Sequence, residues 1–440
     1  MNERTFEALE LDSLIRLLVR HCQTPMGRDV VASLVPLTDV GAIRDALAYT
    51  TECVECLNEA GSFGLSDIQD PADAIAELKV EGSRLEPLQI LAIERVVAVA
   101  SSLRQQARAD DFPLKYPRLA TIASGLPDLR PLLQSVAGKI LPSGEIDDNA
   151  SPQLRRIRRE IGDMRRRVYS SLESVMRAQQ SAIQEELVTI RNGRFVIPVR
   201  TDSRGNVAGV VHGLSSSGVT SYVEPLGVIE QNNDLVRLRE QEENEIANIL
   251  LGVTNQFRAH HQAIADGLDA IARTDFVQAK ARLSREFKCV QPEISESRRL
   301  FLKDARHPIL EENLRKSGAG VVPVSLDMDE SHQVFIVSGP NAGGKTVALK
   351  TAGLLALMAQ MGLHVPAAQA TLTGYRQVFA DIGDQQSIAA NLSTFTAHIR
   401  NVAEMARAVQ APALVLIDEV GTGTDPDEGA APARLYRRLY

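Results

Sequence analysis

The sequence predicts a multidomain protein in which an α-helical N-terminal region and two long helical arms with a small β-rich element precede an α/β domain. Three observations predict this fold class. Apolar residues recur at threes and fours through most of residues 1–290, runs with a period of two interrupt them at about 190–225, and strands and helices alternate from about 291 onward. A chain of 440 residues is long enough for roughly three domains. We expect these at 1–150, 151–290 and 291–440.

The composition is that of an ordinary soluble chain, with 44% hydrophobic and 24% charged residues. A net charge of −8 argues against a protein whose whole surface binds a polyanion, so any nucleic-acid contact must be regional. No apolar run approaches membrane-spanning length and the N-terminus carries acid at Glu3, which predicts a cytoplasmic protein with no membrane partner. The few cysteines are too scattered for a disulfide framework, and the Cys53-x-x-Cys56 pair is expected to pack inside a helix.

The first 150 residues predict a helical domain built from short helices. Leu11, Leu14 and Leu18 share one face of a first helix, and a similar spacing runs through 88–102. Turn signals such as Pro36-Leu37-Thr38-Asp39 separate the helices.

A long helix begins near Leu154, where apolar residues keep one continuous seam to Val175. This spacing predicts a coiled-coil arm. Residues 151–177 contain eight arginines against three acidic residues. Two interpretations stay open, a solvated helix face or a stripe that contacts phosphates. The residues assigned to such a stripe are Arg155, Arg156, Arg158, Arg159, Arg165, Arg166 and Arg167.

A second apolar seam runs from Leu235 to Ile271 on an acidic background. Because the two arms have opposite charge and comparable length, we expect them to pair antiparallel. Between them the period changes to two at 195–199, 207–211 and 219–223, which predicts a small β element at the end of the arms.

The α/β domain is organised around a β-branched run at Val334–Val337, a glycine-rich loop and a helical pattern. The loop reads G-x-x-x-x-G-K-T, and strand, loop and helix in this order predict a P-loop. Backbone N–H groups of such a loop converge on phosphate oxygens at the positive end of the following helix. A nucleotide is thus the expected ligand, with Lys345 against its β- and γ-phosphates and Thr346 on Mg²⁺. The loop residues are Gly339, Pro340, Asn341, Ala342, Gly343, Gly344, Lys345 and Thr346.

A second strand-and-acid pattern follows the P-loop. Residues 413–417 read as a buried strand and are followed directly by Asp418 and Glu419, which is a Walker B pattern. Asp418 is expected to hold Mg²⁺ through water and Glu419 to polarise the attacking water. Residues 377–382 read as a further strand, and a helix is expected to start at about 392.

Four motifs together resemble the ATPase of the MutS family, in its second bacterial branch that lacks the mismatch-reading N-terminal domain. Upstream stretches such as Ala305-Arg306-His307-Pro308 extend the resemblance over nearly all of the chain. The motifs are Gly339 to Thr346, Asp381-Ile382-Gly383-Asp384-Gln385-Gln386-Ser387-Ile388, Leu392-Ser393-Thr394-Phe395 and Asp418-Glu419-Val420-Gly421-Thr422-Gly423-Thr424-Asp425-Pro426.

The resemblance implies a homodimer in which each ATP lies between the P-loop of one subunit and Ser393 of the other. The arms and the β element resemble a lever and a clamp that encircle nucleic acid. Relatives are associated with branched or mismatched DNA, with suppression of recombination, and with stalled ribosomes and their rRNA.

The sequence departs from the family pattern at its end. The sequence stops at Tyr440, shortly after the Walker B acids, and on this ground we expect the later ATPase strands and the Smr nuclease domain of relatives to be missing. We therefore expect an incomplete ATPase domain, no endonuclease activity, and a monomer or a weak dimer.

Two alternatives remain at this point. An SMC-type or ABC-type ATPase shares the P-loop, arms and Walker B strand, but is expected to carry a Ser-Gly-Gly-type signature where 392–395 stands and, in SMC proteins, longer arms. The other alternative is a non-enzymatic remnant that only binds DNA or rRNA.

Overall fold

The computed structural model describes residues 3–339, 344–382 and 391–418. The chain forms two compact units that alternate along the sequence. Unit 1 contains Met1–Asp70, Ala98–Asp128 and Ala265–Tyr440, and unit 2 contains Pro71–Val97 and Leu129–Ile264. The division of the chain into domains at 150 and 290 stays a prediction.

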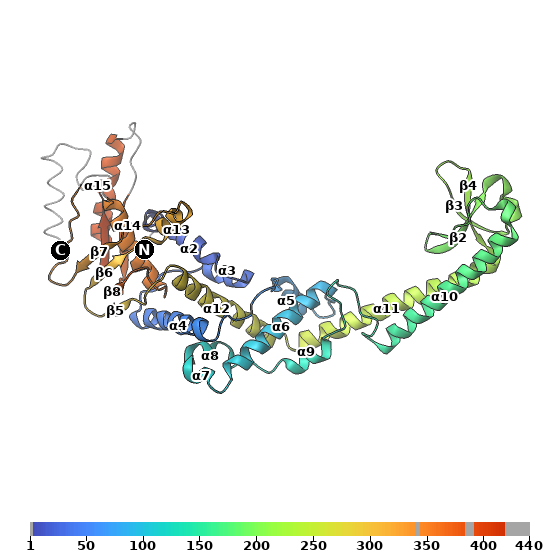
Figure 1. Ribbon diagram of the computed structural model, residues 1–440, viewed down its shortest axis with the longest axis horizontal. Coiled ribbons are helices and arrows are strands. Elements are labelled where there is room, and N and C mark those ends of the chain that lie inside the picture. The colour runs from blue at the N-terminus through green and yellow to red at the C-terminus, as the bar shows by residue number, and fades with distance from the viewer. Residues whose placement is uncertain (1–2, 340–343, 383–390, 419–440) are drawn as a thin grey trace. The chain divides into compact units, whose positions relative to one another are not determined.

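Unit 1 is a mixed helical and sheet structure (Figure 1). Its strands form a four-stranded sheet in the order β5-β8-β6-β7 and a parallel pair, β9 with β10. The strands are β5 (Glu293–Ser295), β6 (Leu300–Ala305), β7 (Val324–Met328), β8 (Gln369–Thr373), β9 (Gln377–Asp381) and β10 (Ala413–Ile417). The helices are α1 (Glu3–Ala8), α2 (Leu11–Val19), α3 (Pro25–Ala32), α4 (Val40–Glu59), α7 (Phe112–Lys115), α8 (Pro117–Ala123), α13 (Pro308–Lys316), α14 (Lys345–Gln360) and α15 (Asn391–Ala408). Two more helices, α6 (Pro87–Ala107) and α12 (His261–Glu286), have residues in both units.

The core of unit 1 surrounds helix α14. Every residue from Thr351 to Gln360 is buried, which is the pattern of a helix covered on all sides. Gly353 allows this close packing, because a Cβ there would lie 2.5 Å from Leu416 of β10 and 2.6 Å from Leu9.

Helix α3 is anchored by a buried carboxylate from a distant part of the chain. Thr24 caps the helix by accepting a hydrogen bond from Gly27 N, and Pro25 occupies its first position. Asp275 of α12 then accepts from Thr24 N at 2.7 Å and from Thr24 Oγ1 at 2.8 Å. The first and last parts of unit 1 are therefore joined by charge-assisted hydrogen bonds.

Unit 2 contains two long helices, α10 (Pro152–Ala178) and α11 (Ile229–Ala259), with a four-stranded antiparallel sheet beside one end of the pair (Figure 1). The sheet order is β1-β2-β4-β3. Its strands are β1 (Thr189–Arg191), β2 (Arg194–Arg200), β3 (Gly209–Leu214) and β4 (Thr220–Pro225). The remaining elements are α5 (Ala72–Leu78), α9 (Arg130–Val136) and the short helices η1 (Gln180–Ala182), η2 (Thr201–Asn206) and η3 (Leu226–Val228).

The α10–α11 pair is antiparallel, as the charge pattern predicts. Ser151 bonds Glu245, Arg158 bonds Glu242, and Gln231 bonds Ser171, so positions rise on one helix as they fall on the other. A shared core joins the helices to the strands, with Ile161 and Leu172 packed in the same cluster as Phe195. This part of the chain therefore contains a long antiparallel helix pair and a small sheet that share one core.

One expectation about an element is wrong. The run at Val334–Val337 has no strand pairing, and Val334 and Ile336 are exposed. A strand needs a hydrogen-bonded neighbour, and none of the described strands forms a ladder with this segment. The second apolar seam spans two helices, since α11 ends at Ala259 and α12 starts at His261. Arg258 fixes this end by donating to the carbonyls of Leu78, Val80 and Ser83.

None of the helices in the described ranges has the length and hydropathy needed to cross a bilayer.

Candidate functional site

Helix α14 begins where the P-loop pattern predicts a helix start. Gly344 precedes it with a φ of +81°, a left-handed conformation that favours glycine. Lys345 and Thr346 are then the first residues of the helix, where backbone N–H groups have no intrahelical partner. Pro340, Asn341, Ala342 and Gly343 lie outside the described residues. The described part of the loop therefore ends at a helix N-terminus suited to an anion.

The amine of Lys345 bonds the residue at which the described part of the loop begins. Its Nζ donates to the carbonyl oxygen of Gly339, six positions earlier in the sequence, at 2.8 Å. This contact places the cation next to the last described residue before the gap at 340–343. A phosphate oxygen could replace this carbonyl as the partner of the amine, because an anionic oxygen is a stronger acceptor for an ammonium group than a backbone carbonyl.

The parallel strands β9 and β10 bring the Walker B acid to the same place. Thr346 Oγ1 donates to Asp418 Oδ2 at 2.5 Å. Because β10 ends at Ile417, Asp418 is the first residue beyond the carboxyl end of the strand. Glu419, the other predicted acid, lies outside the described residues.

The Thr346–Asp418 pair fits Mg²⁺ by the chemistry of its donors. Both are hard oxygens, and Mg²⁺ in nucleotide sites takes one or two carboxylates while phosphates and waters complete its coordination. In the described part of the chain, no three histidine, cysteine or acidic side chains gather into a metal cluster. The pair is thus suited to a metal that arrives with a nucleotide rather than to a resident ion.

Two further side chains lie at the same strand ends and were not assigned a role from the sequence. Asp418 N donates to Asp381 O at 3.1 Å, which places Asp381 at the end of β9 beside the Walker B acid. Asn401 Nδ2 of α15 donates to Asp381 Oδ1 at 3.3 Å. Asp381 begins one of the quoted motifs and could have been selected there, whereas nothing in the sequence pattern singles out Asn401.

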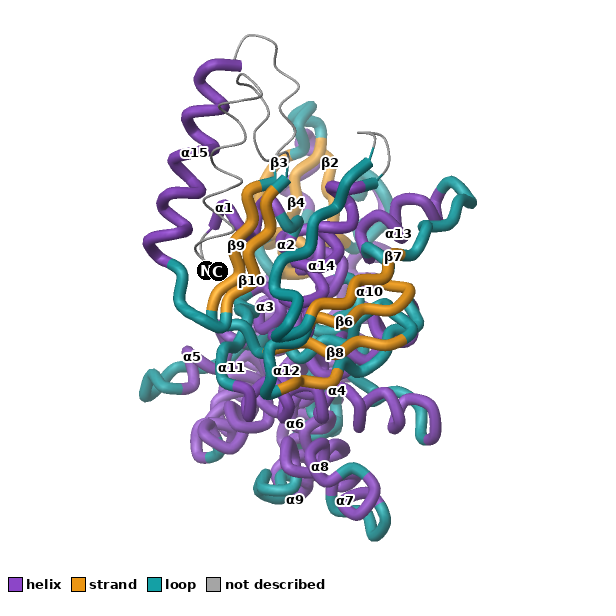
Figure 2. The backbone as a smooth tube through the Cα atoms, turned by 90° about the vertical axis from the view of Figure 1, so that its left-hand side faces the viewer, coloured by secondary structure: helices purple, strands orange, loops and turns teal. Residues whose placement is uncertain are grey.

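Ser393 lies in the first turn of α15, at the third position of the helix. Its side chain is outside the described part of the structure. Figure 2 shows α15 alongside β9 and β10, so the helix that carries Ser393 belongs to the same neighbourhood as Asp418. The predicted role of Ser393 stays a prediction.

The other end of α14 is held by a buried lysine. Lys280 Nζ of α12 donates to Met361 O at 2.7 Å and lies 4.1 Å from the centre of the Phe276 ring. Burial lowers the pKa of Lys280 to about 7, since a low-dielectric interior disfavours the charged form. A cation at this position also complements the negative end of the α14 dipole.

A histidine network lies next to this lysine. His364 Nδ1 is 2.8 Å from Ser284 Oγ, and its Nε2 is 2.9 Å from Thr51 Oγ1. Thr51 already donates to Gln291 Oε1 at 2.8 Å, so it accepts from His364, and the proton of the neutral ring is on Nε2. Burial, and secondarily the charge of Lys280, lowers the pKa of His364 to about 4.

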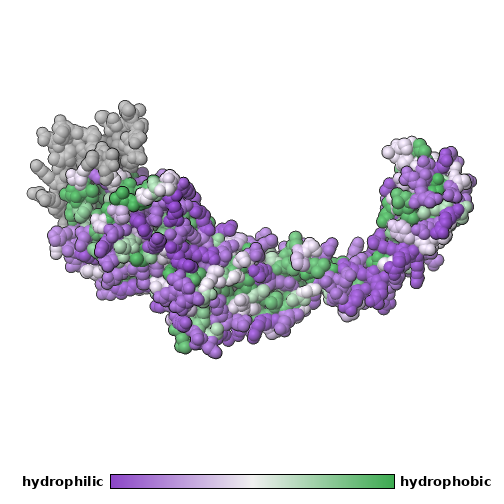
Figure 3. Space-filling view, in the orientation of Figure 1, coloured by the Kyte–Doolittle hydropathy of each residue, from purple (hydrophilic) through white to green (hydrophobic). Residues whose placement is uncertain are grey.

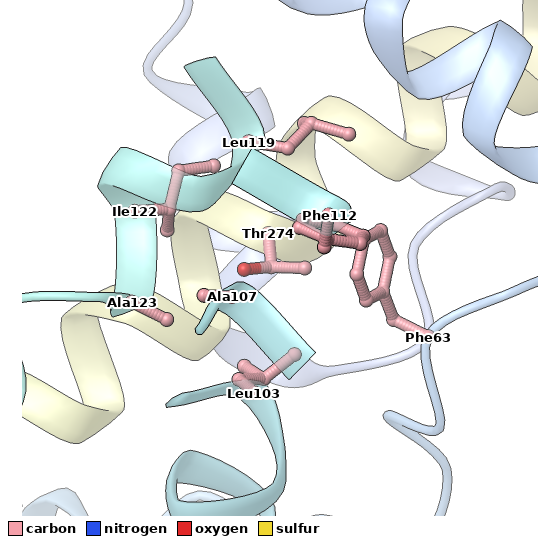
Figure 4. Close-up of a pocket in the computed structure, with 8 residues that line it drawn as sticks. All are labelled: Phe63, Leu103, Ala107, Phe112, Leu119, Ile122, Ala123 and Thr274. Atoms are coloured by element: carbon pink, nitrogen blue, oxygen red, sulfur yellow. The ribbon is translucent and has the colours of Figure 1, made fainter. Parts of the chain in front are cut away.

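A small cavity lies elsewhere in unit 1, where apolar side chains from α6, α7 and α8 converge on Thr274 (Figure 4). Its volume is about 10 Å³, the minimum for one water. Thr274 Oγ1 donates to Ala270 O, so its hydroxyl is already paired. The cavity is a packing gap rather than a ligand site.

The predicted arginine stripe follows α10, and its members differ in their partners. Arg158 is half-buried and bonds Asp148, Glu242 and the carbonyl of Ile146, so it belongs to the contact between the helices. Arg156 and Arg166 are exposed and pair with Glu160 and Asp163 on the same helix.

Four arginines of the stripe have no acidic partner among the described residues, and all of them are exposed. In Figure 3 the visible surface along this helical pair is mostly hydrophilic. The four are Arg155, Arg159, Arg165 and Arg167.

The comparisons with known proteins agree with the motifs. The family described as MutS domain V matches residues 335–437. A protein of Alkaliphilus oremlandii named Endonuclease MutS2 is 37% identical over 436 residues, which cover 98% of this chain and 54% of that protein. A protein of the same name from Thermomicrobium roseum is 38% identical, over 100% of this chain and 56% of its own length. The chain therefore spans about half the length of the curated relatives it matches.

Proposed function

Because this chain belongs to the MutS2 family and spans about half the length of its relatives, we propose that it forms the ATP-binding and nucleic-acid-clamping part of such a protein. Its expected ligands are MgATP and either branched DNA or ribosomal RNA. The SMC-type and ABC-type alternatives are not favoured by these matches.

One observation carries the nucleotide part of the proposal, the contact between Thr346 Oγ1 and Asp418 Oδ2 at 2.5 Å. These residues are 72 positions apart, yet the fold brings a P-loop hydroxyl and a strand-end carboxylate together at the start of α14. This pairing is what a magnesium-bound triphosphate requires.

Each residue then has a separate task. The N–H groups at the start of α14 and the Lys345 amine bind phosphate oxygens. Thr346 and Asp418 are the residues that would hold Mg²⁺, which supplies charge neutralisation on the phosphates when bound. Glu419 follows Asp418 directly and is assigned to orient the attacking water. Ser393 is assigned to the γ-phosphate of ATP bound by the partner of a homodimer.

The nucleic-acid part of the proposal is supported by the arginine stripe on α10. Four exposed arginines without acidic partners in the described ranges add positive charge to a chain whose net charge is −8. Phosphate contacts give affinity without base specificity, so the stripe suits DNA and rRNA alike. Arg158 is assigned to hold α10 against α11, and the exposed arginines to contact phosphates.

The nucleotide proposal is tested by binding of a fluorescent ATP analogue and by hydrolysis of ATP. We expect Lys345→Ala to weaken binding at least tenfold and to abolish hydrolysis, because a charge-assisted contact of about 1.5–3 kcal/mol is lost. Lys316→Ala removes an exposed lysine of α13 and serves as the matched control. Equal, background rates of hydrolysis in the wild type and Lys345→Ala would support the non-enzymatic alternative instead.

The nucleic-acid proposal is tested by the salt dependence of binding to duplex, branched DNA and an rRNA fragment. In the triple variant Arg155→Gln, Arg159→Gln and Arg167→Gln, log affinity for duplex DNA should fall less steeply with log salt. We expect the magnitude of the slope to decrease by up to about 2.7. The same change of charge in unit 1, at Arg44, Arg108 and Arg400, is the control. If both triple variants bound like the wild type, the stripe would be a solvated helix face.

A further inference from the structure

The amide of Asn401 connects three elements of unit 1. On one side, Asn401 Nδ2 donates to Asp381 Oδ1 at the end of β9, at 3.3 Å. On the other side, Asn401 Oδ1 accepts from Arg4 Nη1 of α1 at 2.9 Å. One side chain of α15 is thereby bonded to a strand end and to the N-terminal helix.

The direction of these hydrogen bonds follows from the chemistry of the partners. The arginine guanidinium can only donate, so the atom of Asn401 that faces Arg4 must be the amide oxygen. The amide nitrogen is then left for the Asp381 carboxylate, which at neutral pH can only accept. Since both contacts involve a charged group, each is stronger than a neutral hydrogen bond.

The strand end that Asn401 reaches is part of the nucleotide site. Asp381 pairs with Ile417 in the parallel register of β9 and β10, and its carbonyl accepts from the backbone N–H of Asp418. The path from Asn401 to Asp418 therefore needs only one intermediate residue. Asp418 in turn accepts from Thr346 at the start of α14.

We propose that Asn401 is a positioning residue, which ties helix α15 to the carboxyl ends of β9 and β10 and so fixes where the start of that helix lies. Ser393 is eight residues before Asn401 on the same helix, about 12 Å along its axis. This inference deepens the proposed function and rests on it where it concerns nucleotide. In this arrangement, nucleotide bound at Asp418 affects the position of Ser393 through the contacts of Asp381 and Asn401.

The test is hydrogen exchange of the α15 backbone amides in the full chain, measured first without nucleotide. Asn401→Leu removes both hydrogen bonds at similar side-chain volume. We expect the amides of α15 to exchange about tenfold faster, which corresponds to a loss of about 1.4 kcal/mol in the free energy of opening. Asn401→Asp keeps an acceptor for Arg4 but places a second carboxylate against Asp381, and we expect it to exchange at least as fast.

A double variant distinguishes the tether from a general loss of stability. Asp381→Asn combined with Asn401→Asp exchanges donor and acceptor, so the hydrogen bond can form again and exchange should return to within about threefold of the wild type. Arg400→Gln changes the neighbouring exposed residue, whose partner Glu404 is on the same helix, and should leave exchange unchanged. No rescue by the double variant, or wild-type exchange in Asn401→Leu, would overturn the proposal.

The second measurement adds a non-hydrolysable ATP analogue. We expect the analogue to slow exchange of α15 in the wild type and to have no such effect in Asn401→Leu, although both bind it with affinities within twofold of each other. Slowing that persists in Asn401→Leu would show that the coupling does not pass through Asn401. A wild type that binds no analogue contradicts the proposed function, while the exchange data without nucleotide still decide the tether.

Discussion

Thr346 and Asp418 form the contact on which the site depends, and the hydroxyl can be tested apart from the fold. We expect Thr346→Val to reduce the gain in nucleotide affinity that Mg²⁺ gives by about tenfold, because one oxygen ligand is lost. Thr346→Ser keeps the oxygen and should bind within about twofold of the wild type. Titration of a fluorescent ATP analogue with and without Mg²⁺ measures this. An equal loss in the serine variant would assign the effect to packing of the methyl group.

His364 predicts an acid-sensitive stability of unit 1. The pKa of His364 in the folded protein is lowered to about 4 from its ordinary value of 6.5. Between these two pH values the ring is mostly protonated in the unfolded chain and mostly neutral in the folded chain. The contribution of the neutral ring to the free energy of unfolding is fully present above pH 6.5 and is lost as the pH falls toward 4. The loss amounts to about 3 kcal/mol at most. Lys280, whose pKa is lowered to about 7, is largely protonated across this window.

The measurement is thermal unfolding of the wild type and His364→Gln between pH 4 and 6.5. The variant cannot take up this proton, so its melting temperature should fall less steeply with acid, even if it is lower at every pH. Parallel curves for the two proteins would show that His364 does not contribute to the acid sensitivity.

At individual positions, sequence reasoning predicted residues whose chemistry follows from a motif. Lys345, Thr346 and Asp418 stand at fixed places in a loop and at a strand end, and the structure brings Thr346 and Asp418 together. Asn401 could not be predicted, because its role depends on Arg4 and Asp381, which are distant in sequence. Arg158 looked like its neighbours until its acidic partners Asp148 and Glu242 were placed.

Among the elements, α14 depends on a glycine in its middle. A Cβ at Gly353 would lie within 3 Å of Leu416 and Leu9, both of which are buried. We expect Gly353→Ala to lower the free energy of unfolding of unit 1 by about 1–3 kcal/mol through overpacking. Urea denaturation followed by circular dichroism measures this change.

A glycine of α11 gives the opposite expectation. Gly252 lies inside a helix and has no atom within 4 Å of the Cβ that alanine would add. We expect Gly252→Ala to stabilise unit 2 by roughly 0.5–1 kcal/mol, since alanine loses less backbone entropy in a helix. If both substitutions lowered stability alike, close packing around Gly353 would not be the reason for its cost.

Elements with a long and regular pattern were predicted well, and those that depend on neighbours were not. The seam from Leu154 predicted α10, and the strands of the small β element appear where the period changes to two. The β-branched run at Val334–Val337 has the composition of a strand, but pairing is a property of a sheet and not of one segment. The end of α11 lies next to Arg258, whose hydrogen bonds to Leu78 and Ser83 are contacts that periodicity cannot predict.

For the whole molecule, we predict that association depends on nucleotide. If Ser393 completes the site of a partner, bound ATP is part of the interface, and its binding free energy adds to dimer stability. Light scattering at micromolar protein should show a monomer or weak dimer without nucleotide and a stronger dimer with a non-hydrolysable ATP analogue. A tight dimer in the absence of nucleotide would show that other contacts form the interface.

The bond between Thr24 and Asp275 has a consequence for the order in which the protein can be made. These residues are 251 positions apart, and at 5–20 residues per second a ribosome needs roughly 13–50 s to synthesise the stretch between them. Leu129–Ile264, which belongs to unit 2, emerges during that interval and can begin folding first. The core that contains Leu14 and Leu18 of α2 includes residues after Asp275, such as Leu354, which are synthesised only after that interval. A nascent chain of this protein is therefore a natural client for a chaperone that binds exposed apolar helices near the N-terminus.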